Sequence, residues 1–366
     1  MKSITNEMIR FWCGLLMVLA LTACHDDDEQ SQAPMERSRP SVTLLTSING
    51  VGDNGYNDCI LNGLFKFYEQ TGVVAQLHSP TNMADAEHFY REWLASNANT
   101  DSVVLILGSS AYEQMARQVP TGLKGKGSRV LLLESSATID GVNTVAIDRY
   151  GACYLAGVLL GSSPSYILAA APGFPEIERA IAGYKDGHAA HQTTEHPVAV
   201  DYLANGEEGF AMPDSAYHVM KQRIISQTSD TLSSLVYVET VLPLLGGSGT
   251  GAMKAMSDYE INGGLMVGMD TDRSGQSPCI PFSVVIHIDN ILFDYLTEWR
   301  NGKPWATTQT KGLEEQATEI KFTPNYVFST LAEFYNKDYS TTLFTQKAEQ
   351  YREEAIAKEK STRQAQ

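Results

Sequence analysis

A glycine-rich segment, TSINGVGDNGYN at residues 46–57, carries several polar side chains and follows an apolar run typical of a strand. Its glycines allow tight turns, and Asp53 or Asn57 can cap a following helix or contact a polar ligand. Tyr56 can offer its ring to a ligand or pack internally, and Ser47 stands where the strand ends. The spacing G-x-x-x-x-G-K-S/T does not occur here, so the segment is not a phosphate loop of that type.

Two further segments bring backbone or carboxylate groups to predicted strand ends. In residues 245–251, LGGSGTG, backbone N–H groups near Gly247 can approach a ligand closely, or the segment is a plain flexible turn. In residues 268–273, GMDTDR, Asp270 and Asp272 can accept hydrogen bonds from a diol, supply half of a calcium site or form a solvated turn.

The sequence lacks the common catalytic patterns. It has no G-x-S-x-G elbow and no H-E-x-x-H motif, and Asp270 and Asp272 are the only close carboxylate pair at a predicted strand end. These residues favour binding over catalysis, without a cofactor or a metal ion. The alternative is a hydrolase of the cell envelope that acts on nucleosides or glycosides.

The elements that must position these segments are short apolar strands alternating with helices from residue 41 onward. One series of strands is predicted at 42–46, 73–78, 102–108, 129–134 and 144–148, and a second at 166–171, 198–204, 235–239, 265–269 and 282–288. Strands that are apolar on both faces and separated by helices indicate parallel sheets covered on each side. We therefore expect an α/β chain with two doubly wound Rossmann-like lobes joined by crossover strands.

The expected N-terminal lobe comprises residues 41–148 plus about 271–303, and the C-terminal lobe residues 149–270 plus about 304–344. Residues 345–366 should form a charged C-terminal extension with little to bury. In doubly wound sheets, ligands bind beyond the carboxyl ends of the strands. The three polar segments should therefore meet in a cleft between the lobes.

The first residues are typical of a secretory signal, because Lys2 and Arg10 precede or flank an apolar run that is too short to span a bilayer. The run ends in LTAC, which resembles a bacterial lipobox and implies removal of residues 1–23 and acylation of Cys24. The alternative is an ordinary signal peptide with an incidental cysteine. Residues 24–40 form an acidic, polar tether, either a linker or a surface-export signal like that of some Bacteroidetes lipoproteins. We expect a lipid anchor in the cell envelope, at the periplasmic face or the cell surface.

The composition is that of an acidic globular protein. Of the 366 residues, 43% are hydrophobic and 19% are charged, and the net charge is −16. Nucleic-acid binding is excluded because it needs a basic face, and we expect a monomer that contacts membranes through its anchor alone. Cys59, Cys153 and Cys279 show no C-x-x-C spacing, which leaves open one disulfide with a free thiol or three buried thiols.

Five short motifs, taken in order, resemble the basic membrane protein family, the nucleoside-binding lipoproteins of bacteria. They are GDNGYN at 52–57, YLAG at 154–157, GGSGTG at 246–251, GMDTD at 268–272 and SVVIH at 283–287. The resemblance implies a type I periplasmic-binding fold, a bound nucleoside and delivery to an ABC-type permease. It would place Tyr56 against the base, Asp270 on the ribose hydroxyls and Phe210 as a second stacking ring.

The chain also departs from that family at ligand-contacting positions. Ser47 stands where the family tends to place an aspartate that contacts the purine, and a second such aspartate is missing around Ser109 and Ser110. His287 stands where a lysine would reach the ribose. Two fewer carboxylates and a titratable imidazole change the hydrogen bonds the site can make, so we expect a nucleoside or a related ring-bearing polyol. A ligand-sensing lipoprotein with a sensor partner would share all these features.

Overall fold

The structure is a computed structural model, and it describes residues 40–192, 194–228, 239–259, 264–326 and 340–364, all within one compact unit, Ser38–Gln366. The predicted signal peptide, Cys24 and the tether up to residue 39 lie outside the described residues, as does most of the strand predicted at 235–239. Within the described part, no helix is both long enough and apolar enough to cross a membrane.

The first sheet has six parallel strands in the order β12-β5-β4-β3-β1-β2. These strands are β1 Ser41–Leu45, β2 Ala75–His78, β3 Val103–Leu107, β4 Arg129–Leu133, β5 Asn143–Ile147 and β12 Thr308–Lys311. The central strand β3, VVLIL, is buried along its whole length because helices cover both faces of the sheet. The helices are α2 (Tyr56–Thr71) and α9 (Ile288–Arg300) on one face, and α3 (Met83–Asn97) and α4 (Glu113–Gln118) on the other.

The second sheet is also parallel and has the order β7-β6-β8-β9. Its strands are β6 Ser165–Ala169, β7 Val198–Tyr202, β8 Thr240–Leu244 and β9 Leu265–Met266. Its faces are covered by α5 (Tyr150–Leu160) with α6 (Pro175–Ala189), and by α7 (Pro213–Thr228) with α8 (Gly249–Asp258). A third sheet comprises β10 (Gly268–Asp270), β11 (Phe282–Ile286) and β13 (Thr318–Phe322), with β13 antiparallel to β11.

Helices α5 and α6 pack against each other at very short range. Every residue of α5 is buried, as expected for a helix that is apolar all round. On α6, a Cβ atom at Gly187 would lie 1.9 Å from the carbonyl oxygen of Tyr154, and one at Gly183 would lie 2.2 Å from that of Tyr150. Glycine at these two positions is what lets the backbones approach.

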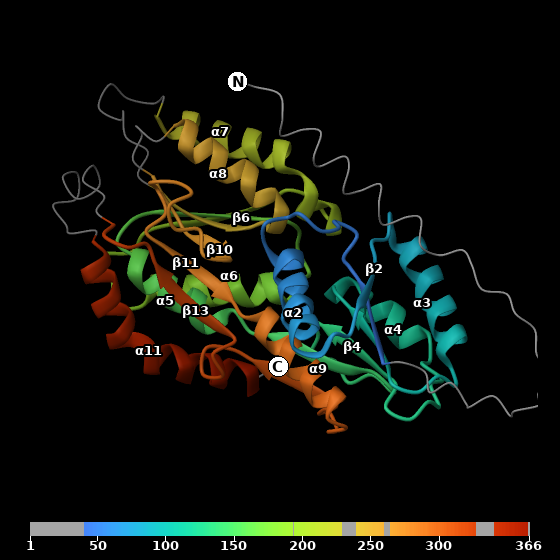
Figure 1. Ribbon diagram of the computed structural model, residues 1–366. Helices are drawn as coiled ribbons and strands as arrows, with labels where there is room; N and C mark the ends of the chain where they lie inside the picture. Colours follow the sequence, from blue (N-terminus) through green and yellow to red (C-terminus); the bar gives the residue numbers. More distant parts are fainter. Residues whose placement is uncertain (1–39, 193, 229–238, 260–263, 327–339, 365–366) are drawn as a thin grey trace, which may run out of the picture. The chain divides into compact units, whose positions relative to one another are not determined.

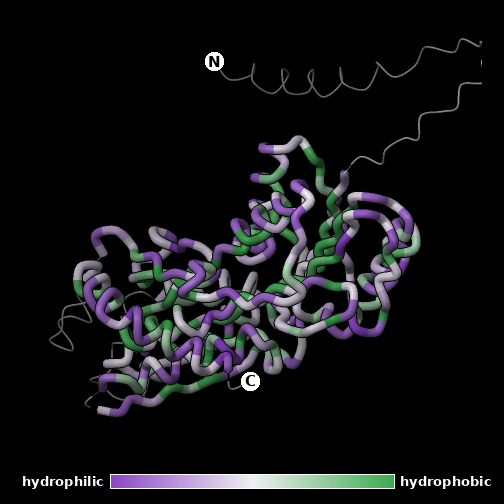
Figure 2. Tube along the Cα trace, turned by 90° about the horizontal axis from the view of Figure 1, so that it is seen from below, coloured by the Kyte–Doolittle hydropathy of each residue, from purple (hydrophilic) through white to green (hydrophobic). Residues whose placement is uncertain are grey.

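Three chain crossings link the six-stranded sheet to the remaining sheets. They lie at Asp148–Arg149 between β5 and α5, at His287 between β11 and α9, and at residues 312–317 between β12 and β13. The apolar residues concentrate in the strands and in the helix faces turned toward them (Figure 2). The predicted α/β fold, with two doubly wound lobes joined by crossover strands, is confirmed.

The C-terminal segment differs from the expectation of a charged extension with little to bury. Residues Thr341–Gln364 form helix α11, which lies along α5 and β13 (Figure 1). It buries Phe344, Ala348, Ala355 and Ile356 on one side. These apolar positions form a narrow stripe among many charged residues, so the overall composition of the segment concealed its packing face.

Two strands near the C-terminus were not predicted, and one changes the expected division of the chain. Strand β12, TQTK, pairs with β5 in the first sheet, although residues 304–344 were expected in the C-terminal lobe. Strand β13, TEIKF, lies at the end of the third sheet. Both are polar edge strands, which lack the apolar run by which the other strands were recognised. The three cysteines of the described residues, Cys59, Cys153 and Cys279, are all buried and free.

Candidate ligand-binding site

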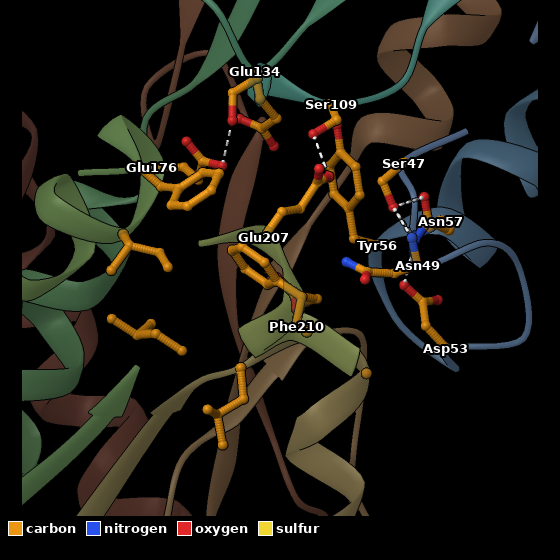
Figure 3. Close-up of a pocket in the computed structure, with 18 of the residues that line it drawn as sticks. Ser47, Asn49, Asp53, Tyr56, Asn57, Ser109, Glu134, Glu176, Glu207 and Phe210 are labelled. Carbon is orange, nitrogen blue, oxygen red and sulfur yellow. Dashed lines mark hydrogen bonds between the residues drawn. The ribbon is translucent and has the colours of Figure 1, made fainter. Parts of the chain in front are cut away.

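A pocket lies where loops at the carboxyl ends of strands from the first and second sheets face each other (Figure 3). The loops after β1, β3, β4 and β5 provide one wall, and the loops after β6, β7 and β8 with the end of β10 provide the other. This is the position that doubly wound sheets use for ligands. Seven of the predicted site residues line it: Ser47, Asp53, Tyr56, Asn57, Phe210, Gly247 and Asp270.

Asp53 and Asn57 hold the start of helix α2. The carboxylate of Asp53 accepts hydrogen bonds from the backbone N–H groups of Gly55 at 2.9 Å and Asn57 at 3.0 Å, and from Nδ2 of Asn57 at 3.0 Å. Nδ2 of Asn57 also donates to Oγ of Ser47 at 3.1 Å. The capping role that the sequence allowed is therefore present, and it stiffens this wall of the pocket.

Tyr56 contributes a ring and a hydroxyl that has no partner. Its Oη is buried without a hydrogen bond, although the residue lines the pocket. Burial, and then the negative charge of Glu134, raise the pKa of this hydroxyl well above its ordinary value, so it remains protonated. A neutral phenol in this position is a ready donor or acceptor for a bound molecule.

Two phenylalanines form the aromatic part of the opposite wall. The rings of Phe174 and Phe210 pack edge to face, with centroids 5.2 Å apart and planes 85° apart. Both residues line the pocket, as does Tyr56. Aromatic faces on two sides suit a ligand that contains a ring.

A buried ion pair lies deep in the pocket. Nη1 and Nη2 of Arg149 donate to the carboxylate of Glu134 at 3.1 and 2.8 Å, and Nε of Arg149 lies 4.0 Å from Oδ1 of Asp270. Burial raises the pKa of Asp270, and the charge of Arg149 opposes this effect. Glu134 directly follows β4, and Asp270 is the last residue of β10. Both have a left-handed backbone, with φ values of 60° and 66°. Such strained positions cluster at functional sites.

Two more carboxylates reach the pocket from the second lobe and are held by adjacent serines of the first. Oγ of Ser109 donates to Oε1 of Glu207, and Oγ of Ser110 donates to Oε1 of Glu176, each at 2.9 Å. Oε2 of each glutamate is buried without a hydrogen-bond partner. Burial and the charge of Glu134 raise the pKa of Glu176 to about 7, and burial also raises that of Glu207.

Several pocket residues were missed by reasoning from the sequence. Glu134 is the last residue of a predicted strand and Arg149 directly follows another, so a search of predicted strand ends could have found both. Glu176 lies in the first turn of α6, and Glu207 lies in the 3-10 helix Glu207–Ala211, where no sequence pattern marked them. The missing aspartates at 47 and 109–110 therefore do not make the pocket poor in carboxylates.

Two predicted site residues lie elsewhere. Asp272 is exposed and caps a turn, accepting hydrogen bonds from the backbone N–H of Ser274 at 2.9 Å and from its hydroxyl at 2.5 Å. His287 precedes α9 at a chain crossing, and its Nε2 lies 3.3 Å from Oε1 of Glu319. Neither residue lines the pocket. No cluster of three or more His, Cys, Asp or Glu residues suited to a metal ion occurs in the described part of the chain.

No family profile matches the chain, and no curated protein matches it. Solved structures do resemble it. A solute-binding protein of an ABC transporter system from Aeropyrum pernix K1 is 15% identical, with a TM-score of 0.68 over 89% of this chain and 90% of that one. The chain has the type I periplasmic-binding fold.

Other proteins with a similar structure have different roles. A transcriptional activator of the comK gene from Bacillus halodurans is 16% identical, with a TM-score of 0.61 over 86% of this chain and 98% of that one. A carbohydrate transporter from Acidothermus cellulolyticus 11B, in complex with myo-inositol, is 13% identical, with a TM-score of 0.57 over 81% and 97%. At these identities the likeness concerns the fold, and function must be argued from the pocket.

Proposed function

We propose that this chain is a solute-binding protein that holds a small polar, ring-bearing molecule between its lobes and leaves it chemically unchanged. One observation carries the proposal: Oη of Tyr56, Oε2 of Glu176 and Oε2 of Glu207 are buried without partners in a pocket lined by aromatic rings. A buried polar atom without a hydrogen bond is costly, and a ligand with several donors would satisfy all three.

The chemistry of the pocket fits a nucleoside or a related polyol. Carboxylates accept hydrogen bonds from ring hydroxyls, while Tyr56, Phe174 and Phe210 offer apolar faces to the ring itself. Structural neighbours support this class, because one is a carbohydrate transporter in complex with myo-inositol and another a solute-binding protein in complex with D-arabinose. The resemblance of the five sequence motifs to the basic membrane protein family favours a nucleoside among these ligands.

We further propose that the protein is anchored to the cell envelope by a lipid on Cys24 and passes its ligand to an ABC-type permease. Support comes from the lipobox-like LTAC sequence and from structural neighbours that belong to ABC transport systems. A sensor that reads the ligand-bound form would use the same pocket.

Native mass spectrometry of the purified protein tests ligand binding even while the ligand is unidentified. We expect a co-purified small molecule, or binding of at least one member of a panel of nucleosides, pentoses and inositols. The same panel, incubated with the protein and analysed by chromatography, should be recovered intact. Turnover that disappears in Glu176→Gln would instead establish the hydrolase, since Glu176 has the raised pKa of a general acid.

A further inference from the structure

The pocket is strongly acidic. Five of the residues that line it carry carboxylates, Asp53, Glu134, Glu176, Glu207 and Asp270, whereas Arg149 is the one lining residue with a permanent positive charge. The five carboxylates come from different loops and are compensated to different degrees. The carboxylates whose negative charge is least balanced by nearby cations or N–H groups are the ones available to a ligand.

Three of these carboxylates have internal compensation. Asp53 accepts backbone N–H groups at the start of α2, and Glu134 forms the two-bond pair with Arg149. Asp270 lies 4.0 Å from Arg149, and the charge of Arg273 also lowers its pKa against the effect of burial. A charge that is paired or capped in this way requires nothing from a ligand.

Glu176 and Glu207 differ, because neither has a cation of its own. Each accepts a neutral serine hydroxyl at Oε1, a backbone N–H also acts on each carboxylate, and Oε2 has no hydrogen-bond partner. Glu207 is 9% exposed, so its carboxylate is removed from water without a cation. Arg149 does act on Glu176, but it already pairs with Glu134, and Glu134 repels Glu176. The hydroxyls of the consecutive residues Ser109 and Ser110 therefore tie both of these carboxylates to the loop after β3.

We infer that the ligand carries a positively charged nitrogen, which binds between Glu176 and Glu207. This inference rests on the proposed solute-binding function and deepens it. Glu176, Glu207 and Phe210 line the pocket (Figure 3), and Phe174, whose ring packs against that of Phe210, lines it too. Desolvated ammonium groups are stabilised both by carboxylates and by aromatic faces. Amino sugars and amino-substituted nucleosides combine the ring, the hydroxyls and the charge.

Binding of a neutral polyol would differ in its effect on the protonation of the two glutamates. Its hydroxyls can donate to Oε2 of both glutamates, but two negative charges would then remain buried with no cation. The glutamates would have to take up protons when such a ligand binds. A cationic ligand needs the ionised carboxylates, so its affinity falls as the pH is lowered through the pKa of Glu176, about 7.

Calorimetry with matched ligand pairs tests the inference on the purified full-length protein. The probes are glucosamine against glucose, and 5′-amino-5′-deoxyadenosine against adenosine. In at least one pair, we expect the amine to bind with an affinity at least ten times higher than that of its neutral partner. Neutral members that bind as tightly as the amines would overturn the inference and leave the solute-binding function intact. Failure of every probe to bind would count against both.

Substitutions locate the effect within the pocket. Glu207→Gln and Glu176→Gln keep the shape of the side chain but remove its charge, so each should abolish the tenfold preference for the amine. Asp272→Asn removes a carboxylate that is exposed and lies outside the pocket, and it should leave the preference unchanged. A preference that survives in both glutamine variants would place the cation elsewhere and refute the assignment to Glu176 and Glu207.

Discussion

The hydroxyl of Ser109 donates a 2.9 Å hydrogen bond to Oε1 of Glu207 and so ties the loop after β3 to the 3-10 helix after β7. The two residues are 98 positions apart in the chain and belong to different sheets. The bond is buried, and it joins the two lobes directly across the candidate pocket. The bond therefore ties a carboxylate of one lobe, which lines the pocket, to a loop of the other lobe.

Replacing Ser109 with alanine should remove this hydrogen bond between the lobes and destabilise the protein. The buried Oε1 of Glu207 would lose its donor, at a cost of about 1–3 kcal/mol in the free energy of unfolding. Urea denaturation of Ser109→Ala against the wild type measures the loss. Ser361→Ala, on the exposed side of α11, removes a hydroxyl that makes only a local bond and should change stability by less than about 0.5 kcal/mol. Equal stability of Ser109→Ala and Ser361→Ala would show that the contact between the lobes contributes nothing.

Glu359 is a fully buried carboxylate of α11 that gives the protein a specific pH dependence. It accepts hydrogen bonds from the backbone N–H groups of Gly151 at 2.9 Å and Leu313 at 3.0 Å, and from Arg363 at 2.9 Å. Burial, and then the charge of Asp148, raise its pKa to about 7. Between about pH 4.5 and pH 7, Glu359 is therefore protonated in the folded chain and ionised in the unfolded chain. Its contribution to the stability of the fold increases as the pH falls through this range.

Glu359→Gln should remove that contribution. The wild type should gain stability relative to the variant between pH 8 and pH 5, on the order of 1–3 kcal/mol, since one pKa unit corresponds to about 1.4 kcal/mol. Thermal or urea unfolding of both proteins at the two pH values measures how the stability difference between them changes with pH. Effects of the other titrating groups are the same in both proteins and cancel. Glu353→Gln, exposed on the same helix, should show no such change with pH. Parallel pH profiles for the wild type and Glu359→Gln would contradict the raised pKa.

Arg363 joins α11 to the first chain crossing. Its Nε donates to Oδ2 of Asp148 at 2.8 Å, and Asp148 also pairs with Arg179 at 2.6 Å. Arg363→Ala should destabilise the protein by about 1–3 kcal/mol, because it removes one of the two cations from a buried carboxylate. Lys360→Ala breaks an exposed pair with Glu314 and should cost less than about 1 kcal/mol. Chemical denaturation compares the two, and similar losses would mean that α11 is held by its apolar stripe alone.

The fold was predictable wherever strands and helices carried an apolar run of their own. Helix α5, Tyr150–Leu160, carries such an apolar run, and all eleven of its residues are buried. Strands β12 and β13 were not predicted because they lie at sheet edges and carry polar side chains. Helix α11 was misjudged because its packing depends on a few apolar positions and on contacts such as the ion pair between Arg363 and Asp148, which are 215 positions apart.

The pocket was predictable where a side chain directly follows a strand. Ser47 and Asp270 each follow a predicted strand, and both line the pocket, as expected when ligands bind beyond the carboxyl ends of strands. Glu176 and Glu207 reach the pocket from helical turns, so their positions depend on how the two lobes face each other, which no local pattern encodes. His287 also follows a strand, but its side chain faces Glu319 on β13 at the chain crossing.

The lipid anchor is a prediction that rests on LTAC at residues 21–24. Cys24→Ser removes the thiol that would be acylated, so we expect a soluble protein or an uncleaved precursor in place of a membrane-bound form. Fractionation of membranes, followed by intact mass measurement, separates these outcomes. Replacing Cys59, which is buried in the core, with alanine should leave the membrane association unchanged. Unaltered processing and membrane association in Cys24→Ser would refute the anchor.

Tyr56 allows the ring and the hydroxyl to be tested separately. Tyr56→Ala removes a stacking face worth roughly 1–3 kcal/mol by analogy with nucleic-acid bases, so affinity for the co-purified ligand should fall by about ten- to a hundredfold. Tyr56→Phe keeps the face and removes an unpartnered buried hydroxyl, so the ligand-free protein should be as stable as the wild type or slightly more stable.

The affinity of Tyr56→Phe then reports whether the hydroxyl meets the ligand. A loss of about five- to tenfold is expected, because the hydrogen bond that relieves the buried Oη is absent in the variant. Tyr68 lies on the same helix α2 but is 49% exposed, so Tyr68→Phe and Tyr68→Ala are matched controls that should bind like the wild type. Calorimetry of the four variants gives the two contributions. Wild-type affinity in Tyr56→Ala would mean that the ligand binds away from this wall, whereas wild-type affinity in Tyr56→Phe alone would limit the role of Tyr56 to its ring.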